Sequence, residues 1–257
     1  MIQIKTEKIS RHPVNVILPT DYDSNKKYRT IYLQDGGNAA KQALNYIDHL
    51  IISRQIEPLI LVGITPLDRN EEYTPWPART PLSGETKSGG QAQAYLQLLV
   101  KEIKPFIDAH YATDPAPSHT AIGGCSFGGL ISLLASYYYP EVFHDYIILS
   151  ASFWYEKMDR FLSGEQITLE DHSFQKPQVN RGSQRMYLYV GQQEGIYRQG
   201  RQKEMFSYTQ KAYSHLVEEG FSDKNLHFET CAKGTHDVLF FSPHFIHALQ
   251  WLYGKSY

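Results

Sequence analysis

The sequence predicts an α/β fold in which a central, mostly parallel sheet is flanked by helices. Short apolar, β-branched runs alternate along the 257 residues with longer stretches of helical period. Most of the predicted strands are rich in Ile, Leu and Val, which is typical of strands buried on both faces. The composition, 42% hydrophobic and 20% charged, indicates an ordinary globular domain.

In chain order, we predict strands at residues 14–18, 29–33, 59–64, 120–123, 146–149, 186–190 and 226–230. Apolar residues recur at spacings of three and four over 96–107, 205–216 and 245–252, and each of these runs predicts an amphipathic helix. We expect the last helix to begin after Ser242, whose hydroxyl can cap it, with Pro243 at the first helical position.

Two stretches lack this regularity. Residues 66–90 are rich in Pro and Gly, and residues 156–184 are polar without clean periodicity. Neither shifts the composition enough to form a linker or a second core. We therefore predict one α/β domain over residues 1–257, with loop excursions at about 66–90 and 156–184.

Charge and composition exclude several functional classes. The 25 Lys and Arg residues are balanced by 27 Asp and Glu residues, so a nucleic-acid partner is not expected. No apolar run reaches the roughly 20 residues of a membrane span. Two distant cysteines, Cys125 and Cys231, exclude a disulfide framework. We expect a cytoplasmic protein without a membrane partner; the oligomeric state cannot be read from the sequence.

The clearest chemical signal is a G-x-S-x-G string centred on Ser126, between the strand 120–123 and a helix that carries Leu130 and Leu134. A strand, a tight turn and a helix are the context that a nucleophile elbow requires. A glycine-rich turn without catalytic function is the simpler alternative.

A nucleophilic serine needs a histidine base, and the base needs an acid partner. In α/β hydrolases these follow the serine in the order acid, then histidine. His236 lies in a turn after the strand 226–230 and is the predicted base. Glu194 follows the strand 186–190 and is the predicted acid, with Asp223 as the alternative.

An oxyanion hole needs two preorganised N–H groups. The first candidate is the backbone N–H of Phe127, immediately after Ser126. The second is the backbone N–H of Gly37, in a segment of small residues after the strand 29–33. An ordinary Asp-Gly turn is the alternative interpretation of that segment.

Beyond the elbow, several segments resemble the putative-esterase (esterase D-like) family of α/β hydrolases. The resemblance covers the chain from about Val14 to Leu252. The segments that carry it are Tyr32-Leu33-Gln34-Asp35-Gly36-Gly37-Asn38, Val62-Gly63-Ile64 with Arg69, Glu72-Tyr73-Thr74-Pro75, and Glu102-Ile103-Lys104-Pro105-Phe106-Ile107 before Tyr111.

The resemblance implies an α/β-hydrolase fold and a serine esterase. By this resemblance Ser126 is the nucleophile, His236 the base and Glu194 the acid, and the N–H groups of Gly37 and Phe127 form the oxyanion hole. Neither a metal nor an organic cofactor is implied. The pair His244 and His247 gives a poor zinc signal, because no carboxylate or cysteine set lies near it in the sequence.

The resemblance leaves the specific substrate open. The segment from Ser150 to Trp154 is similar to one in siderophore and feruloyl esterases, but has Ala151 where proline is common. The expected partner is a small-molecule ester, and the predicted substrate-binding residues are Arg69, Trp76, Arg79, Phe153 and Trp154. Ferric-siderophore trilactones and feruloyl or acetyl-carbohydrate esters are alternative substrates. Acyl transfer and a non-catalytic binding scaffold of the same fold also remain open.

Overall fold

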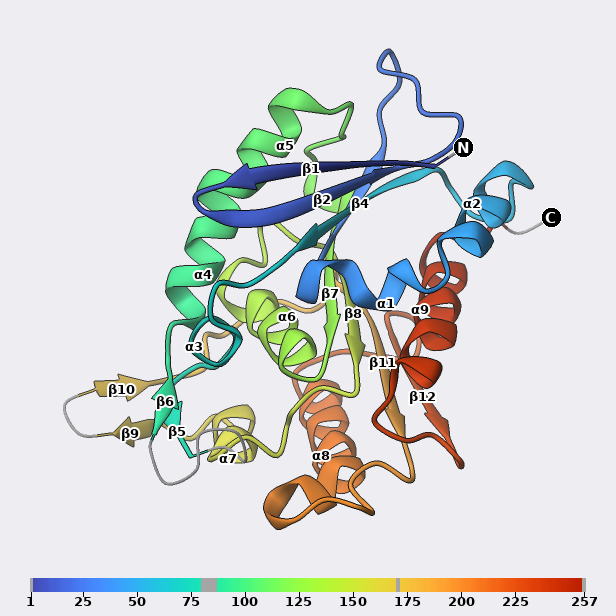
Figure 1. The fold of residues 1–257 in the computed structure, drawn as a ribbon. Coiled ribbons are helices and arrows are strands. Elements are labelled where there is room, and N and C mark those ends of the chain that lie inside the picture. The colour runs from blue at the N-terminus through green and yellow to red at the C-terminus, as the bar shows by residue number, and fades with distance from the viewer. Residues whose placement is uncertain (1, 80–86, 170–171, 256–257) are drawn as a thin grey trace.

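A central sheet with helices on both faces organises the molecule, as the computed structural model shows for residues 2–79, 87–169 and 172–255 (Figure 1). Within these residues the sheet has eight strands in the order β1-β2-β4-β3-β7-β8-β11-β12. The pairs β1–β2 and β2–β4 are antiparallel, and the other neighbours are parallel. The strands are β1 (Gln3–Ile9), β2 (His12–Leu18), β3 (Arg29–Leu33), β4 (Leu59–Ile64), β7 (Thr120–Cys125), β8 (Asp145–Leu149), β11 (Arg185–Gly191) and β12 (Leu226–Cys231).

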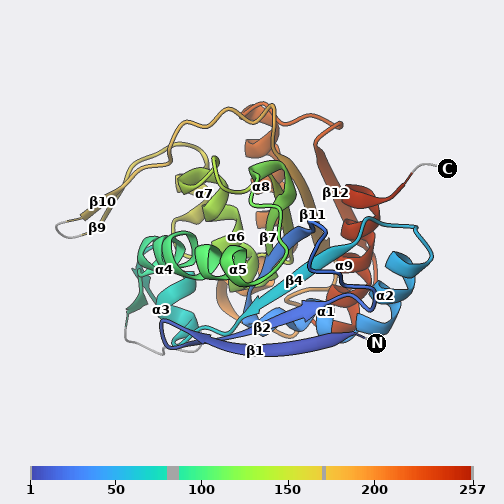
Figure 2. The ribbon, with the colours of Figure 1, turned by 90° about the horizontal axis from the view of Figure 1, so that it is seen from above.

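Two helical layers cover the sheet, and Figure 2 shows them on opposite sides of the strands. The helices are α1 (Asn38–Lys41), α2 (Leu44–Ile52), α3 (Arg69–Tyr73), α4 (Ala92–Leu98), α5 (Lys104–His110), α6 (Phe127–Tyr138), α7 (Met158–Leu162), α8 (Met205–Glu218) and α9 (Val238–Tyr253). A turn of π-helix, Leu99–Ile103, joins α4 to α5. Helices α1, α2 and α9 pack on one face, and α4, α5, α6 and α8 pack on the other.

Alternation along the strands distributes apolar side chains between these two layers. In β11, Met186 and Leu188 belong to the core under α6 and α8, whereas Tyr187 and Tyr189 belong to the core under α9. Successive strand residues point to opposite faces, so a strand covered on both sides must be apolar throughout. This is why the parallel strands were visible in the sequence as continuous apolar runs.

The predicted fold class is therefore confirmed, and each of the seven predicted strands corresponds to an observed one. Strand β1 was not predicted, because it lies at the sheet edge and its residues are mostly exposed and polar. The predicted start of the last helix is wrong. Helix α9 begins at Val238, where the Asp237 side chain accepts a hydrogen bond from the Leu239 N–H. Pro243 lies inside the helix, and the Ser242 hydroxyl donates to the Ala39 carbonyl.

The two predicted excursions contain short elements where they are described. The first holds α3 and the strands β5 (Pro77–Ala78) and β6 (Ser88–Gly89). The second holds α7 and the strands β9 (Ile167–Leu169) and β10 (His172–Phe174). No helix in the described ranges combines the length and apolar character that crossing a bilayer requires. A cytoplasmic location stays a prediction.

Candidate active site

Ser126 lies in a strained turn between β7 and α6. Its φ and ψ are 59° and −123°, a conformation that non-glycine residues adopt rarely and that often marks functional sites. The turn is tight enough to require glycine on both sides. A Cβ at Gly124 would lie 2.7 Å from the Gly128 carbonyl carbon, and a Cβ at Gly128 would lie 2.9 Å from Gln34 Cβ. The backbone thus holds Ser126 at the carboxyl end of the sheet.

The structure brings Glu194 and His236 together from loops that follow β11 and β12. His236 Nδ1 lies 2.8 Å from Glu194 Oε2. The Gly191 N–H donates to Glu194 Oε1 at 2.9 Å, and the Ser150 hydroxyl donates to the same oxygen. Because a carboxylate accepts the Nδ1 proton, the neutral imidazole presents its Nε2 lone pair.

Glu194 rather than Asp223 is the acid that meets His236. Glu194 is buried, whereas Asp223 is exposed in the turn before β12, at the opposite end of that strand from His236. Among the alternatives left open by the sequence, the geometry therefore favours Glu194.

A cleft of about 520 Å³ opens above the carboxyl ends of β3 and β7, and both Ser126 and His236 line it. Ser126 Oγ lies 3.2 Å from Ser152 Oγ, which is the hydrogen-bond partner of the serine in this structure. Burial, and secondarily the Asp35 carboxylate, raise the pKa of the neighbouring Cys125 thiol well above its ordinary value. This thiol therefore stays protonated and is a poor candidate nucleophile.

The two predicted oxyanion donors differ. Phe127 is the first residue of α6, so its N–H has no intrahelical acceptor. The Gly37 N–H donates to the Gln34 carbonyl at 3.0 Å. The Gly37 N–H is therefore already used within the turn in this structure, and its role as an oxyanion donor stays a prediction.

Gln34 offers a donor that the sequence analysis missed. Its side chain lines the cleft and is buried. Tyr95 donates to Gln34 Oε1 at 2.5 Å, while Gln34 Nε2 has no hydrogen-bond partner among the described residues. A buried amide N–H without a partner is costly, and it is available to a bound ligand.

The predicted substrate-binding residues fall into three groups. Arg69 lines the cleft, where its guanidinium pairs with Asp35 at 2.7 and 3.0 Å. Arg79 and Trp154 line a second pocket of about 270 Å³. Trp76 and Phe153 are buried in the core and line neither of these pockets, so the prediction of direct substrate contact is wrong for these two.

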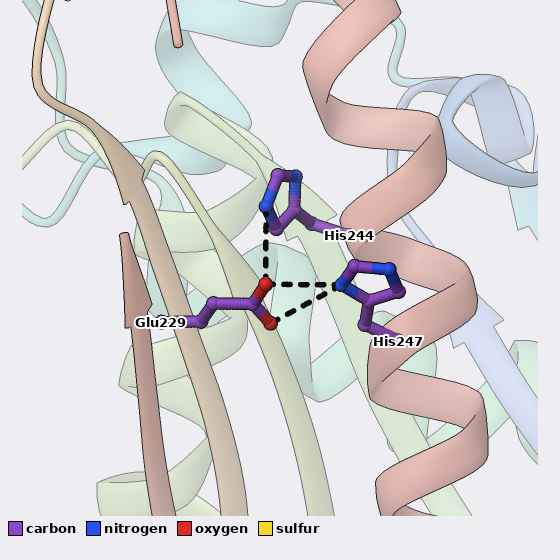
Figure 3. A group of neighbouring side chains, drawn as sticks. All are labelled: Glu229, His244 and His247. Carbon is purple, nitrogen blue, oxygen red and sulfur yellow. Dashed lines mark hydrogen bonds and ion pairs between the residues drawn. The ribbon is translucent and has the colours of Figure 1, made fainter. Parts of the chain in front are cut away.

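The carboxylate that the sequence lacked near the histidine pair is supplied by the fold. Glu229 of β12 lies beside His244 and His247 of α9, and the donor atoms of all three lie within 4.8 Å of one another (Figure 3). The expectation that no carboxylate accompanies His244 and His247 is therefore wrong.

Comparison with known proteins assigns the chain to a family. Residues 9–252 match the family model described as "Putative esterase". The protein YbbA of Bacillus subtilis, itself uncharacterised, is 30% identical over 254 residues, which cover 98% of this chain and 97% of that protein.

Solved structures share the fold at lower identity. An IroE-like serine hydrolase from Shewanella oneidensis has a TM-score of 0.76 at 21% identity, covering 98% of this chain and 80% of that one. The siderophore hydrolase EstA from Aspergillus nidulans has a TM-score of 0.71 at 19% identity, covering 98% and 93%. The predicted α/β-hydrolase fold is confirmed by this likeness. Because the family match spans nearly the whole chain, this protein belongs to the putative esterase family and is a hydrolase of carboxylic ester bonds.

Proposed function

We propose that this chain hydrolyses a small-molecule carboxylic ester through Ser126, His236 and Glu194, with an acyl-enzyme intermediate on Ser126. The observation that carries the proposal is the 2.8 Å hydrogen bond between His236 and the buried Glu194 at a cleft that also contains Ser126. A serine, an imidazole and an orienting carboxylate are the groups that acyl transfer requires.

In the proposed first step, Ser126 Oγ attacks the ester carbonyl while His236 Nε2 takes the hydroxyl proton. For this step the Ser126 hydroxyl must first turn from Ser152 toward His236, since Ser152 is its hydrogen-bond partner in the structure. His236 next gives the proton to the departing alcohol. Glu194 remains ionised and stabilises the imidazolium that forms in between.

In the second step, water attacks the acyl group on Ser126 and His236 again transfers the proton. The negative charge on the carbonyl oxygen is stabilised by N–H groups that are already oriented. We assign these to the Phe127 backbone N–H and to Gln34 Nε2, which replaces Gly37 in our proposal. Gln34 suits this role because its free amide N–H is buried beside the cleft.

The substrate class that we propose to test first is a ferric-siderophore trilactone. EstA is named a siderophore hydrolase, and its fold covers 98% of this chain. Arg69 is paired with Asp35, so it does not bring an uncompensated positive charge to the cleft. Arg79 and Arg201 line the second pocket together with Glu156, so two positive charges against one negative charge favour an anionic substrate there.

The test is hydrolysis of p-nitrophenyl esters from acetate to decanoate, a feruloyl ester and a ferric trilactone by the wild type and by Ser126→Ala. We expect Ser126→Ala to lower kcat by at least about 10⁴-fold. Ser214→Ala, on the exposed face of α8, is the matched control and should leave kcat unchanged. A fluorophosphonate probe should label the wild type and not the Ser126 variant.

The outcomes separate the alternatives. Cleavage of simple esters with intact trilactone would keep the esterase mechanism and reject the siderophore substrate. Products acylated on an added alcohol would indicate acyl transfer. If no ester is cleaved and no probe labels Ser126, the proposed mechanism is wrong and a non-catalytic scaffold is favoured.

A further inference from the structure

We propose that Glu229, His244 and His247 bind one divalent metal ion of the zinc class. Figure 3 shows the carboxylate reaching from β12 toward two imidazoles on α9. The histidines lie three residues apart, so they project from the same face of the helix. The inference concerns a site outside the catalytic cleft and is independent of the proposed catalytic roles.

The spacing of the donor atoms suits such an ion. His247 Nδ1 lies 3.0 Å and His244 Nε2 lies 3.4 Å from Glu229 Oε1. A tetrahedral zinc ion with ligands at about 2.0–2.1 Å holds neighbouring ligand atoms about 3.3 Å apart. Two of the three distances within the cluster therefore already fit, and the third, between the two imidazoles, is at most 4.8 Å.

Neighbouring groups orient two of the three ligands. His244 Nδ1 donates to the Phe240 carbonyl at 2.7 Å, so in the neutral ring the lone pair is on Nε2, which faces Glu229. Tyr187 donates its hydroxyl to Glu229 Oε2. Two such hydrogen bonds commonly orient the ligands of metal sites. In one, the ring nitrogen that does not bind the metal donates to a carbonyl; in the other, the ligating carboxylate accepts from a neighbouring group.

The types of ligand also determine which metal ions the site favours. Two imidazoles and one carboxylate favour zinc and its neighbours in the first transition series over calcium or magnesium, which prefer oxygen ligands. His244 is buried and His247 is half exposed, so the ion can enter from the His247 side and keep water in a fourth position. On binding, the ion replaces the Nδ1 proton of His247, and the neutral ring carries its proton on Nε2 instead.

Such an ion would join β12 to α9. The connection between these elements, residues 232–237, contains His236. A bound ion would therefore restrain the two ends of the loop that carries His236, and we expect it to stabilise the folded protein.

The test is calorimetric titration of chelator-treated protein with ZnCl₂ at pH 7.5, together with thermal melts. The wild type should bind one equivalent of Zn²⁺ and melt at a higher temperature when loaded. His247→Ala should lower the affinity at least about 10-fold and abolish the shift in melting temperature. Because His247 is half exposed, this variant should fold; Glu229→Gln is the second variant and should also weaken binding.

His215→Ala is the matched control. His215 also lies beside a glutamate, Glu218 at 3.3 Å, but it has no second histidine in that pair. This variant should bind Zn²⁺ as the wild type does. Co²⁺ should give visible d–d bands without a thiolate band, because neither cysteine is a proposed ligand. Absence of saturable binding, or binding that survives both His247→Ala and Glu229→Gln, overturns the proposal.

Discussion

A buried carboxylate lies near each end of strand β11, and the two carboxylates have different hydrogen-bond partners. At its start, Arg185 pairs with Asp145 of β8 at 2.8 and 2.9 Å, and His144 and Arg29 also contact Asp145. Beyond its end, Glu194 accepts hydrogen bonds from Ser150, Gly191 and His236, and no arginine is among these partners. Both carboxylates are fully shielded from solvent.

This difference separates a structural charge from one that is suited to catalysis. Burial alone would raise the pKa of Asp145, but hydrogen bonds from His144 and Arg185 hold it below its ordinary value. The Asp145 charge is thus compensated permanently. Glu194 instead accepts hydrogen bonds from two neutral donors, the Ser150 hydroxyl and the Gly191 N–H, and lies beside the His236 imidazole, which in our proposed mechanism gains a proton during the reaction.

The largest expected effect is on catalysis at the Glu194 end. Glu194→Gln keeps the size of the side chain, but its amide can donate to His236 Nδ1 and so favours the wrong imidazole tautomer. We expect kcat for the best ester substrate to fall about 10⁴-fold, with a melting temperature close to that of the wild type. Steady-state kinetics and thermal melts check this. A variant that keeps more than a tenth of the wild-type kcat would show that Glu194 is not the orienting acid.

The next effect is on stability at the opposite end. Asp145→Ala leaves Arg185 and Arg29 without their shared partner and should lower the free energy of unfolding by about 3 kcal/mol. Urea denaturation measures this, and kcat per folded molecule should not change. The control Glu165→Ala removes a pair with Arg160 in which both side chains are half exposed, and should cost less than about 1 kcal/mol. Equal losses for the two variants would contradict the distinction between the ends.

A smaller effect is expected at the unpartnered amide of Gln34. Gln34→Leu removes one proposed oxyanion donor and should lower kcat about 10²-fold with little change in KM. Tyr95→Phe removes the hydroxyl that holds Gln34 Oε1 but keeps the donor, so its effect on kcat should be smaller. If Tyr95→Phe lowers kcat as much as Gln34→Leu, the amide acts only through packing.

Much of this architecture could be predicted from the sequence because it depends on local patterns. Strands β3 and β4 were predicted with the observed bounds, since apolar runs bounded by polar residues define strands buried on both faces. The chain order of Ser126, Glu194 and His236 placed each after a parallel strand, and such strand ends meet at one edge of a sheet. The encounter of Glu194 with His236 was therefore expected, whereas their catalytic roles stay proposals.

The remaining features depend on contacts between distant segments. The Gly37 N–H is used in a hydrogen bond within its own turn, and the amino-acid types of that segment do not reveal this bond. Tyr95, 61 positions away, donates to Gln34 Oε1, while Gln34 Nε2 has no hydrogen-bond partner in the described part of the chain. Ser152 meets Ser126 because β8 lies beside β7. Gln34 and Ser152 both follow predicted strands, so attention to every polar residue at a strand end would have marked them as candidates.

The smallest expected effect is the pH dependence of stability at the Asp145 end. Because the pKa of Asp145 is lower in the folded protein than in the unfolded chain, its ion pairs stabilise the protein above the unfolded value, about 3.9, and this contribution disappears as the pH falls through the folded pKa. The difference in unfolding free energy between the wild type and Asp145→Asn should therefore be constant from pH 7 to about 5 and shrink below about 4. Urea midpoints at several pH values measure this difference. A difference that stays constant below about pH 4 would contradict the lowered pKa of Asp145, and the permanent compensation inferred for this end of β11 would be wrong.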